Sequence, residues 1–197
     1  MGRSKAFNEE LVLDKAVEVF WAKGYEATSI QDLVDAMGIQ RGSLYGTFGS
    51  KQELFLKSLD RYSLMVVKEL LALLTSKTSA LESIELFFDK LVEHLLTAGP
   101  LRGCLITNSA VEFGLRDERT RQKVLYLLKG LEQGFYQTLL RAQENGEISK
   151  EHNLTALAEY LTNSMQGLLV MGKVHSERSV LENINRITFL FLNNITL

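Results

Sequence analysis

Apolar residues recur at helical spacing along almost the whole chain, and this regularity constrains the fold more than any other feature. The first such stripe consists of Leu13, Ala16, Val17 and Phe20. Only one of the 197 residues is a proline, Pro100. Because proline is the strongest helix breaker, its near absence leaves room for long, uninterrupted helices. The sequence therefore predicts an all-α fold.

Composition limits the class of protein and its compartment. Hydrophobic residues make up 46% and charged residues 23% of the chain, which is ordinary for a globular protein. Cys104 is the single cysteine, so an intrachain disulfide and a cysteine zinc cluster are excluded. The N-terminal stretch lacks the apolar core of a secretory signal, and charges interrupt the apolar runs before membrane-spanning length. We therefore expect a soluble, cytoplasmic protein with no membrane segment.

Glycines and capping patterns predict three short helices at the start of the chain. The first helix closes at Gly24, a good C-terminal residue. Thr28 with Gln31 has the spacing of a capping box and opens a second helix that ends at Gly38. The third helix is expected over residues 40–48.

Longer helices follow. Ser50 with Glu53 forms another capping pattern and opens a helix through about residue 74. Further helices are expected over about residues 81–95, 102–115, 118–143, 154–169 and 184–191. The change near Ser50 is the only candidate domain boundary, which predicts a domain over residues 1–50 and a larger one over residues 51–197.

Two of the short helices have the proportions of a helix-turn-helix. Residues 28–37 and 40–48 are joined by a tight glycine turn, and such a pair places its second helix in the major groove of DNA. Leu44 and Phe48 stand four residues apart and should face inward against the first helix.

The outward face of residues 40–48 then carries glycines. Gly42 and Gly46 lie on this face beside Ser43. The flanking positions are Gln40, Arg41, Tyr45 and Thr47. Each glycine lowers helix stability by about 1 kcal/mol relative to alanine, so the presence of two glycines in one short helix requires an explanation. Close approach of the backbone to another surface is such an explanation.

Local charge in this region suits DNA, although the formal net charge of −2 gives no global support. Residues 36–52 contain no acidic residue, while Arg41 and Lys51 add positive charge. The expected helix N-termini at Ser29 and Ser50 suit phosphate oxygens. These few phosphate contacts give one subunit little affinity for DNA. We therefore expect binding to need a dimer and to weaken as the salt concentration rises.

Two points remain open on these residues. Arg3 and Lys5, in an N-terminal arm, could contact phosphates or a minor groove. Alternatively, the segment is a small three-helix bundle with a polar face and no DNA-binding role.

Over about residues 7–55 the sequence resembles the TetR family of bacterial regulators. The matching positions are Leu13, Ala16, Phe20, Gly24-Tyr25, Ala27-Thr28-Ser29-Ile30, Leu33, Gly38-Ile39, Arg41-Gly42-Ser43-Leu44-Tyr45, Phe48, Ser50-Lys51 and Leu54-Phe55. The resemblance implies an N-terminal helix-turn-helix domain and a larger helical domain for ligand sensing and dimerisation. It also implies double-stranded DNA as a partner.

The same resemblance implies roles for individual residues. Thr28, Tyr45 and Lys51 would contact phosphates. The residues that would approach base edges are Gln40, Arg41, Ser43 and Thr47. Two positions depart from the family pattern: Gln40 stands where a serine cap is common, and Gly46 where a histidine or another large residue is common.

Two apolar stripes in the C-terminal half are candidates for a symmetric four-helix dimer interface. Their members are Leu154, Leu157, Leu161, Leu168, Ile184, Ile187 and Phe191. Residues 160–172 contain no charge, which fits a helix buried on more than one side. The alternative is that these residues form the intrachain core.

A ligand pocket would have to lie among the helices between about residues 84 and 171. The bulky candidates are Phe87, Phe88, Phe113, Tyr126, Phe135, Tyr136, Tyr160, Met165 and Met171, and the polar ones are His94, Asn108, Glu112 and Gln166. Each of them has a simpler interpretation as core or as surface.

Cys104 has two interpretations. It follows the helix break at Pro100 and stands near an expected helix N-terminus beside Arg102, a setting that favours a reactive thiolate. The Gly103-Cys104-Leu105 stretch before the sixth helix resembles that of TetR-family regulators that include responders to electrophiles or oxidants. Alternatively, the cysteine is a small buried hydrophobe.

Motifs of enzymes are missing from the sequence. It has no phosphate-binding glycine loop, paired metal-ligand motif or nucleophile elbow. We therefore expect no enzyme, cofactor or metal site.

The sequence thus favours a homodimeric regulator, a repressor released from a palindromic operator by a small-molecule effector or by thiol modification. The alternative is a ligand-independent DNA-binding protein whose C-terminal domain contacts a protein partner.

Overall fold

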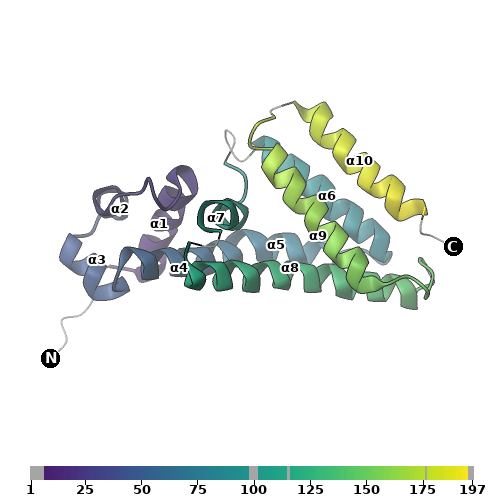
Figure 1. The fold of residues 1–197 in the computed structure, drawn as a ribbon, viewed down its shortest axis with the longest axis horizontal. Helices are drawn as coiled ribbons and strands as arrows, with labels where there is room; N and C mark the ends of the chain where they lie inside the picture. Colours follow the sequence, from purple (N-terminus) through teal and green to yellow (C-terminus); the bar gives the residue numbers. More distant parts are fainter. Residues whose placement is uncertain (1–6, 98–101, 115, 176, 195–197) are drawn as a thin grey trace.

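The computed structural model describes residues 7–97, 102–114, 116–175 and 177–194, and every regular element within these ranges is a helix. The all-α prediction is confirmed. The helices form an elongated molecule, with three short helices at one end and a bundle of longer ones at the other (Figure 1). Within the same ranges, no helix combines the length and the apolar character needed to cross a membrane.

Three short helices form the N-terminal end. They are α1 (Glu9–Lys23), α2 (Ile30–Met37) and α3 (Arg41–Phe48), close to the bounds expected from the sequence. Asn8 begins α1, because its side chain accepts a hydrogen bond from the backbone N–H of Glu10 at 2.9 Å. Phe20, Leu33 and Leu44 have no exposed surface and form the core of this unit.

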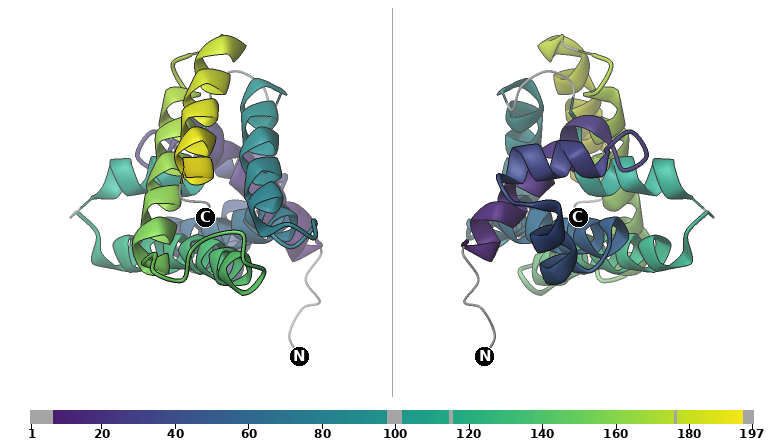
Figure 2. Two further views of the ribbon diagram at one scale, coloured as in Figure 1. Left: turned by 90° about the vertical axis from the view of Figure 1, so that its right-hand side faces the viewer. Right: turned by 90° about the vertical axis from the view of Figure 1, so that its left-hand side faces the viewer.

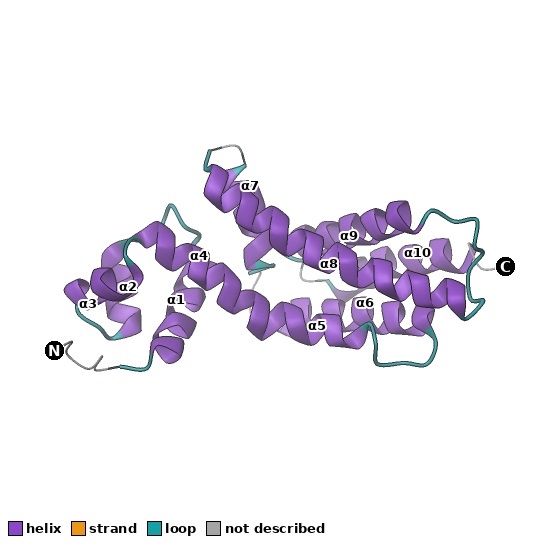
Figure 3. Ribbon diagram, turned by 90° about the horizontal axis from the view of Figure 1, so that it is seen from below, coloured by secondary structure: helices purple, strands orange, loops and turns teal. Residues whose placement is uncertain are grey.

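A continuous helical stretch connects the two ends. It consists of α4 (Lys51–Tyr62), the π-helical turn η1 (Ser63–Val67) and α5 (Lys68–Leu73). The sequence predicted one helix here, and the π turn was not foreseen because a single wider turn leaves no distinct apolar spacing. Helix α4 packs along α1, and an ion pair of 2.6 Å between Arg61 Nε and Asp14 Oδ1 joins these two helices. Helix α8 (Glu118–Glu144) runs beside this stretch (Figure 3).

The C-terminal end is a bundle around an aromatic centre. It contains α6 (Ala80–Thr97), α7 (Leu105–Phe113), α9 (Leu154–Met171) and α10 (Arg178–Asn194) (Figures 1 and 2). Helix α8 packs against α6, α7 and α9, and α10 packs against α6 and α9. Phe87, Phe88 and Phe135 have no exposed surface, and the ring centroids of Phe87 and Phe135 are 5.0 Å apart. These rings fill the middle of the bundle.

Glu147, in the turn after α8, fixes the start of α6. Its carboxylate accepts hydrogen bonds from the backbone N–H groups of Ala80 and Leu81, both at 2.9 Å, and from Ser79 and Asn145. Partial burial alone would raise its pKa, but these hydrogen bonds lower the pKa of Glu147 to about 2. Glu147 thus supplies the negative charge that a helix N-terminus favours.

Candidate nucleic-acid interface

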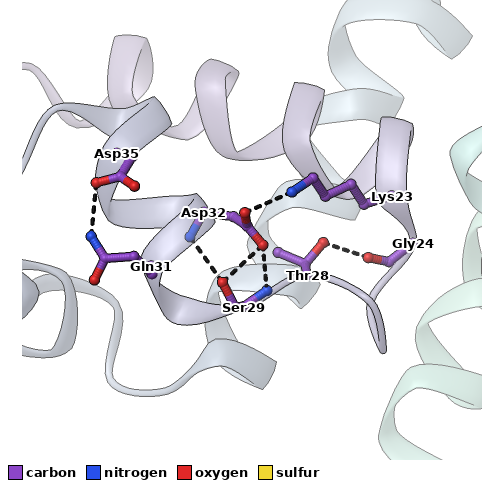
Figure 4. Close-up of polar contacts among 7 residues, drawn as sticks. All are labelled: Lys23, Gly24, Thr28, Ser29, Gln31, Asp32 and Asp35. Atoms are coloured by element: carbon purple, nitrogen blue, oxygen red, sulfur yellow. Dashed lines mark hydrogen bonds and ion pairs between the residues drawn. The ribbon is translucent and has the colours of Figure 1, made fainter.

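The turn before α2 is organised by a reciprocal cap. The Ser29 hydroxyl accepts a hydrogen bond from the Asp32 N–H at 3.0 Å, while the Asp32 carboxylate accepts from the Ser29 N–H at 2.8 Å (Figure 4). Lys23 lies 2.6 Å from the same carboxylate, and these hydrogen bonds, that from Lys23 foremost, lower the pKa of Asp32 far below its ordinary value. The capping box is therefore Ser29 with Asp32. The Thr28–Gln31 assignment is wrong, because Gln31 instead donates to Asp35.

Thr28 lies inside the turn. Its side chain is 1% exposed and its hydroxyl donates to the Gly24 carbonyl at 2.5 Å. In the free protein this burial leaves the Thr28 hydroxyl little access to a phosphate, and the expected contact stays a prediction. Ser29 is exposed, but its hydroxyl is already bonded to Asp32. The turn therefore offers DNA less than the sequence suggested.

Helices α2 and α3 meet at a sharp turn. Gly38 adopts φ +68°, ψ +32°, the left-handed conformation that glycine adopts without strain, and its N–H bonds to the Val34 carbonyl at 3.0 Å. Leu44 and Phe48 face inward, at 0% and 4% exposure, as predicted. The opposite side of α3 is thereby turned to solvent.

This side of α3, here called the reading face, is defined by the exposed residues Gln40, Arg41, Gly42, Tyr45 and Gly46 and the half-buried Ser43 and Thr47. Tyr45 is 42% exposed. Within the described ranges, none of the polar side chains of the reading face has a hydrogen bond or ion pair to the rest of the chain. The hydrogen-bond donors of these side chains are therefore available to bind a second molecule.

The two glycines of the reading face have no packing role in the protomer. A Cβ added at Gly42 or Gly46 would meet nothing within 4 Å, and neither residue has a positive φ. Because alanine would be tolerated and would favour the helix, the free protein gives no reason for glycine at these positions. Close approach of a partner surface is a reason that remains.

Lys51 lies at the start of α4, next to the reading face. Its ammonium is 4.2 Å from the centroid of the Tyr25 ring, and Ser50 caps the helix by accepting from the Glu53 N–H at 3.1 Å. Arg3 and Lys5, also expected near DNA, lie outside the described residues.

The helix-turn-helix is held against the C-terminal bundle by Glu112 of α7. The two carboxylate oxygens of Glu112 accept hydrogen bonds from the backbone N–H groups of Tyr25 and Glu26, at 3.0 and 2.7 Å. The Tyr25 ring also contacts Phe113, with centroids 5.1 Å apart. The sequence named Glu112 only as a pocket candidate, because nothing in its spacing links it to a turn 87 residues away.

Comparisons with known proteins agree with this architecture. Residues 12–57 match the description "Bacterial regulatory proteins, tetR family", and residues 80–188 match "Tetracyclin repressor-like, C-terminal domain". The chain is 38% identical over 184 residues to the HTH-type transcriptional regulator YezE of Bacillus subtilis (strain 168), which covers 93% of this chain and 95% of that protein.

The chain belongs to the TetR family. It is accordingly a DNA-binding transcriptional regulator of the helix-turn-helix class. A second relative is the HTH-type transcriptional repressor ComR of Escherichia coli (strain K12), 31% identical over 87% of this chain and 82% of ComR.

A solved structure shows how one relative meets DNA. The TetR-family regulator CifR, as a cysteine mutant complexed with a 26-bp double-strand operator, superposes with a TM-score of 0.87. The identity is 26%, and the alignment covers 95% of this chain and 98% of CifR.

The interface candidates of this TetR-family protein separate into two groups. Leu154, Leu157, Leu161 and Leu168 are between 0% and 9% exposed and belong to the protomer core, so they are not available to a partner. Ile184 is half-buried against the same core. Ile187 and Phe191 are exposed, at 56% and 39%. Helix α9 packs against α8, which accounts for a leucine stripe that is buried within the protomer.

The pocket candidates are also spread out. Phe87, Phe88, Phe135 and Met165 are core residues. Tyr126 and Tyr160 are 71% and 37% exposed and cannot line an enclosed cavity. Tyr136 and Met171 are half-buried against the core, and Phe113 packs at the junction with α1. Among the polar candidates, His94 of α6 stacks on Trp21, Gln166 of α9 accepts from Thr107 of α7, and Asn108 of α7 accepts from Lys173.

Cys104 immediately precedes α7 and is 7% exposed. Tyr62 is 2% exposed, and its burial, together with the neighbouring Cys104, raises the pKa of Tyr62 well above the ordinary value. The thiol is thus enclosed between α4 and α7, which fits its interpretation as a packed hydrophobe better than that as an open reactive group.

Proposed function

We propose that this regulator is a homodimeric repressor that binds a palindromic operator through the reading face of α3. It dissociates from the operator when an effector binds to the C-terminal helical bundle. The observation that carries the proposal is the reading face itself. Gln40, Arg41 and Tyr45 are exposed and form no hydrogen bond or ion pair within the described ranges, and a Cβ at either glycine would contact nothing in the protomer.

A dimer face is available on α9 and α10. Tyr160, Ile187, Leu190 and Phe191 are between 37% and 56% exposed, and the ring centroids of Tyr160 and Phe191 are 4.7 Å apart. Exposed apolar side chains on two adjoining helices favour pairing with the same helices of a second copy, which forms a four-helix interface.

The effector site is best supported near α6 and α9. His94 Nε2 and Gln166 Nε2 are buried and have no hydrogen-bond partner among the described residues. Burial lowers the pKa of His94, so its imidazole is neutral at pH 7. Gln166 Oε1 accepts from the Thr107 hydroxyl at 2.6 Å. A ligand with polar groups would satisfy these two nitrogens, which otherwise destabilise the fold.

The path from effector to DNA is short. Helix α7 carries Thr107 near Gln166 and Glu112 against the turn that precedes α2. A ligand that moves α7 relative to α9 would change the orientation of the helix-turn-helix and hence the spacing of two reading faces in a dimer. A coupling free energy of about 1–3 kcal/mol is enough to release an operator.

Selection of bound duplexes from a random pool tests the proposal. We expect enrichment of an inverted repeat whose half-sites are about 10–10.5 base pairs apart, or a multiple of that spacing, with affinity that falls steeply as salt rises. Enrichment of no sequence, or of a single half-site bound by a monomer, would contradict it.

Thiol modification is the other form of effector, and one variant separates it from ligand binding. If Cys104 is the sensor, Cys104→Ser keeps operator affinity and loses release by an electrophile such as N-ethylmaleimide. Full release in that variant would eliminate the thiol as sensor.

A further inference from the structure

A groove separates the last turn of α1 from α7 and α9. It has a volume of about 440 Å³, within the range of small-molecule sites, and its walls come from both ends of the protein. His94 and Gln166 do not line it, but two lining residues contact them: Trp21 stacks on His94, and Thr107 donates to Gln166 Oε1.

Three hydrogen bonds connect the segments that line the groove. The Asn108 amide donates to the Arg102 carbonyl at 2.9 Å and accepts from Lys173 Nζ at 3.0 Å. The Trp21 indole donates to the Gly103 carbonyl at 2.9 Å. These bonds hold the loop before α7, the end of α1 and the end of α9 in one arrangement, so a ligand would meet a preorganised site.

The groove has an excess of positive charge. Lys23, Arg102 and Lys173 line it, against Glu112 alone. Lys23 and Arg102 are each 2.6 Å from a carboxylate outside the groove, on Asp32 and Glu18.

Lys173 differs from the other two cations. Its only hydrogen-bond partner among the described residues is the neutral amide oxygen of Asn108. The single carboxylate of the groove, Glu112, is already engaged by two backbone N–H groups. The ammonium of Lys173 therefore has no anionic partner in the part of the chain that the structure describes.

The walls above this charge are apolar. Trp21, Ala22, Val111 and Val170 line the groove, and Val111 and Val170 are 78% and 45% exposed. Covering them with an apolar group would remove them from water. A fully hydrated phosphate gains nothing from such walls, whereas a carboxylate with an apolar part matches both features.

We propose that this groove binds a small organic carboxylate, with the carboxylate on Lys173 and its apolar part between Trp21, Val111 and Val170. The effect of this ligand on DNA binding rests on the proposed function. Because the ligand contacts α1 and α9 together, it shifts the population of helix-turn-helix orientations and changes operator affinity.

Trp21 is the only tryptophan in the chain, so its fluorescence reports directly on the groove. Benzoate is the probe, benzamide its uncharged counterpart, and inorganic phosphate the anion without an apolar part. We expect a saturable change in Trp21 emission with benzoate, at least tenfold weaker binding of benzamide and phosphate, and a change of at least about fivefold in operator affinity at saturating benzoate.

Lys173→Gln should weaken benzoate binding at least tenfold and remove its effect on the operator. Lys150→Gln, which loses the same charge on the turn after α8, should bind benzoate like the wild type. Absence of a saturable signal, equal binding of benzamide, or unchanged binding by Lys173→Gln would overturn the proposal. Operator binding without benzoate is measured on the same samples, so failure of the groove is distinguished from failure of the repressor.

Discussion

The aromatic centre of the C-terminal bundle and the reading face of α3 differ in where their side chains find contacts. Around Phe87, Phe88 and Phe135 every ring is enclosed by the protein itself. On the reading face the polar side chains have no hydrogen-bond or ion-pair partner within the described ranges, and no side chain covers the backbone at Gly42 and Gly46. The first region is explained by folding alone, whereas the second is explained only by a second molecule.

This difference separates effects on stability from effects on binding. Substitutions in the centre should lower the free energy of unfolding by several kcal/mol. Substitutions of the polar side chains on the reading face should leave the free energy of unfolding within about 0.5 kcal/mol and weaken operator binding.

Phe135→Ala should have the largest effect. Loss of a fully buried ring leaves a cavity, and we expect the free energy of unfolding to fall by about 3–5 kcal/mol in urea titrations followed by circular dichroism. Tyr126→Ala, at a residue 71% exposed, should change it by less than about 0.5 kcal/mol. Equal losses of unfolding free energy in the two variants would contradict the special role of the aromatic centre.

Arg41→Ala should act on DNA alone. Arg41 is exposed and has no partner within the described ranges, so we expect unchanged unfolding and a loss of about 1–3 kcal/mol in operator binding, measured by fluorescence anisotropy. Lys150→Ala, which removes the same charge far from α3, should bind the operator like the wild type. Full operator affinity in Arg41→Ala would remove this residue from the interface.

Gly46→Ala should move stability and binding in opposite directions. The added methyl group meets nothing within 4 Å in the protomer, so the free energy of unfolding should rise by about 0.5–1 kcal/mol while the operator binds more weakly.

Gly130→Ala on α8 is the matched control, because a Cβ there also meets nothing within 4 Å. It should gain stability and keep operator affinity. If Gly46→Ala also keeps operator affinity, the idea of close backbone approach fails.

Glu147→Gln should have the smallest effect and tests the bundle alone. The pKa of Glu147 is lowered to about 2, so its carboxylate adds stability above the ordinary value near 4.5, and this part is lost as the pH falls toward 2. We expect a loss of about 1 kcal/mol or less at pH 7 and a weaker decline of stability between pH 5 and pH 3 than in the wild type. The same acid-induced decline in both proteins would exclude this role.

The sequence predicted the short N-terminal helices well because their limits are set locally. Gly24, Gly38 and Gly49 each end a helix, and Leu44 and Phe48 face the core as their spacing requires. A Ser-x-x-Asp pattern at Ser29 was available as the true capping signal and would have corrected the Thr28 assignment.

The C-terminal half was predicted less well, because its contacts are not local. The leucines of α9 could not be assigned to core or interface from periodicity, since both environments select the same residues. The groove beside Trp21 depends on residues from α1, α7 and α9, and no spacing along the chain brings Trp21 next to Asn108 and Lys173. The division of the chain at residue 50 stays a prediction.

The most direct test compares the affinity for a selected operator with that for a scrambled duplex, in the wild type and in an Arg41→Ala, Tyr45→Phe double variant. We expect the wild type to prefer the operator by at least about 10³-fold and the double variant to lose most of this preference while remaining dimeric and folded. An unchanged preference in the double variant would show that another surface reads the DNA.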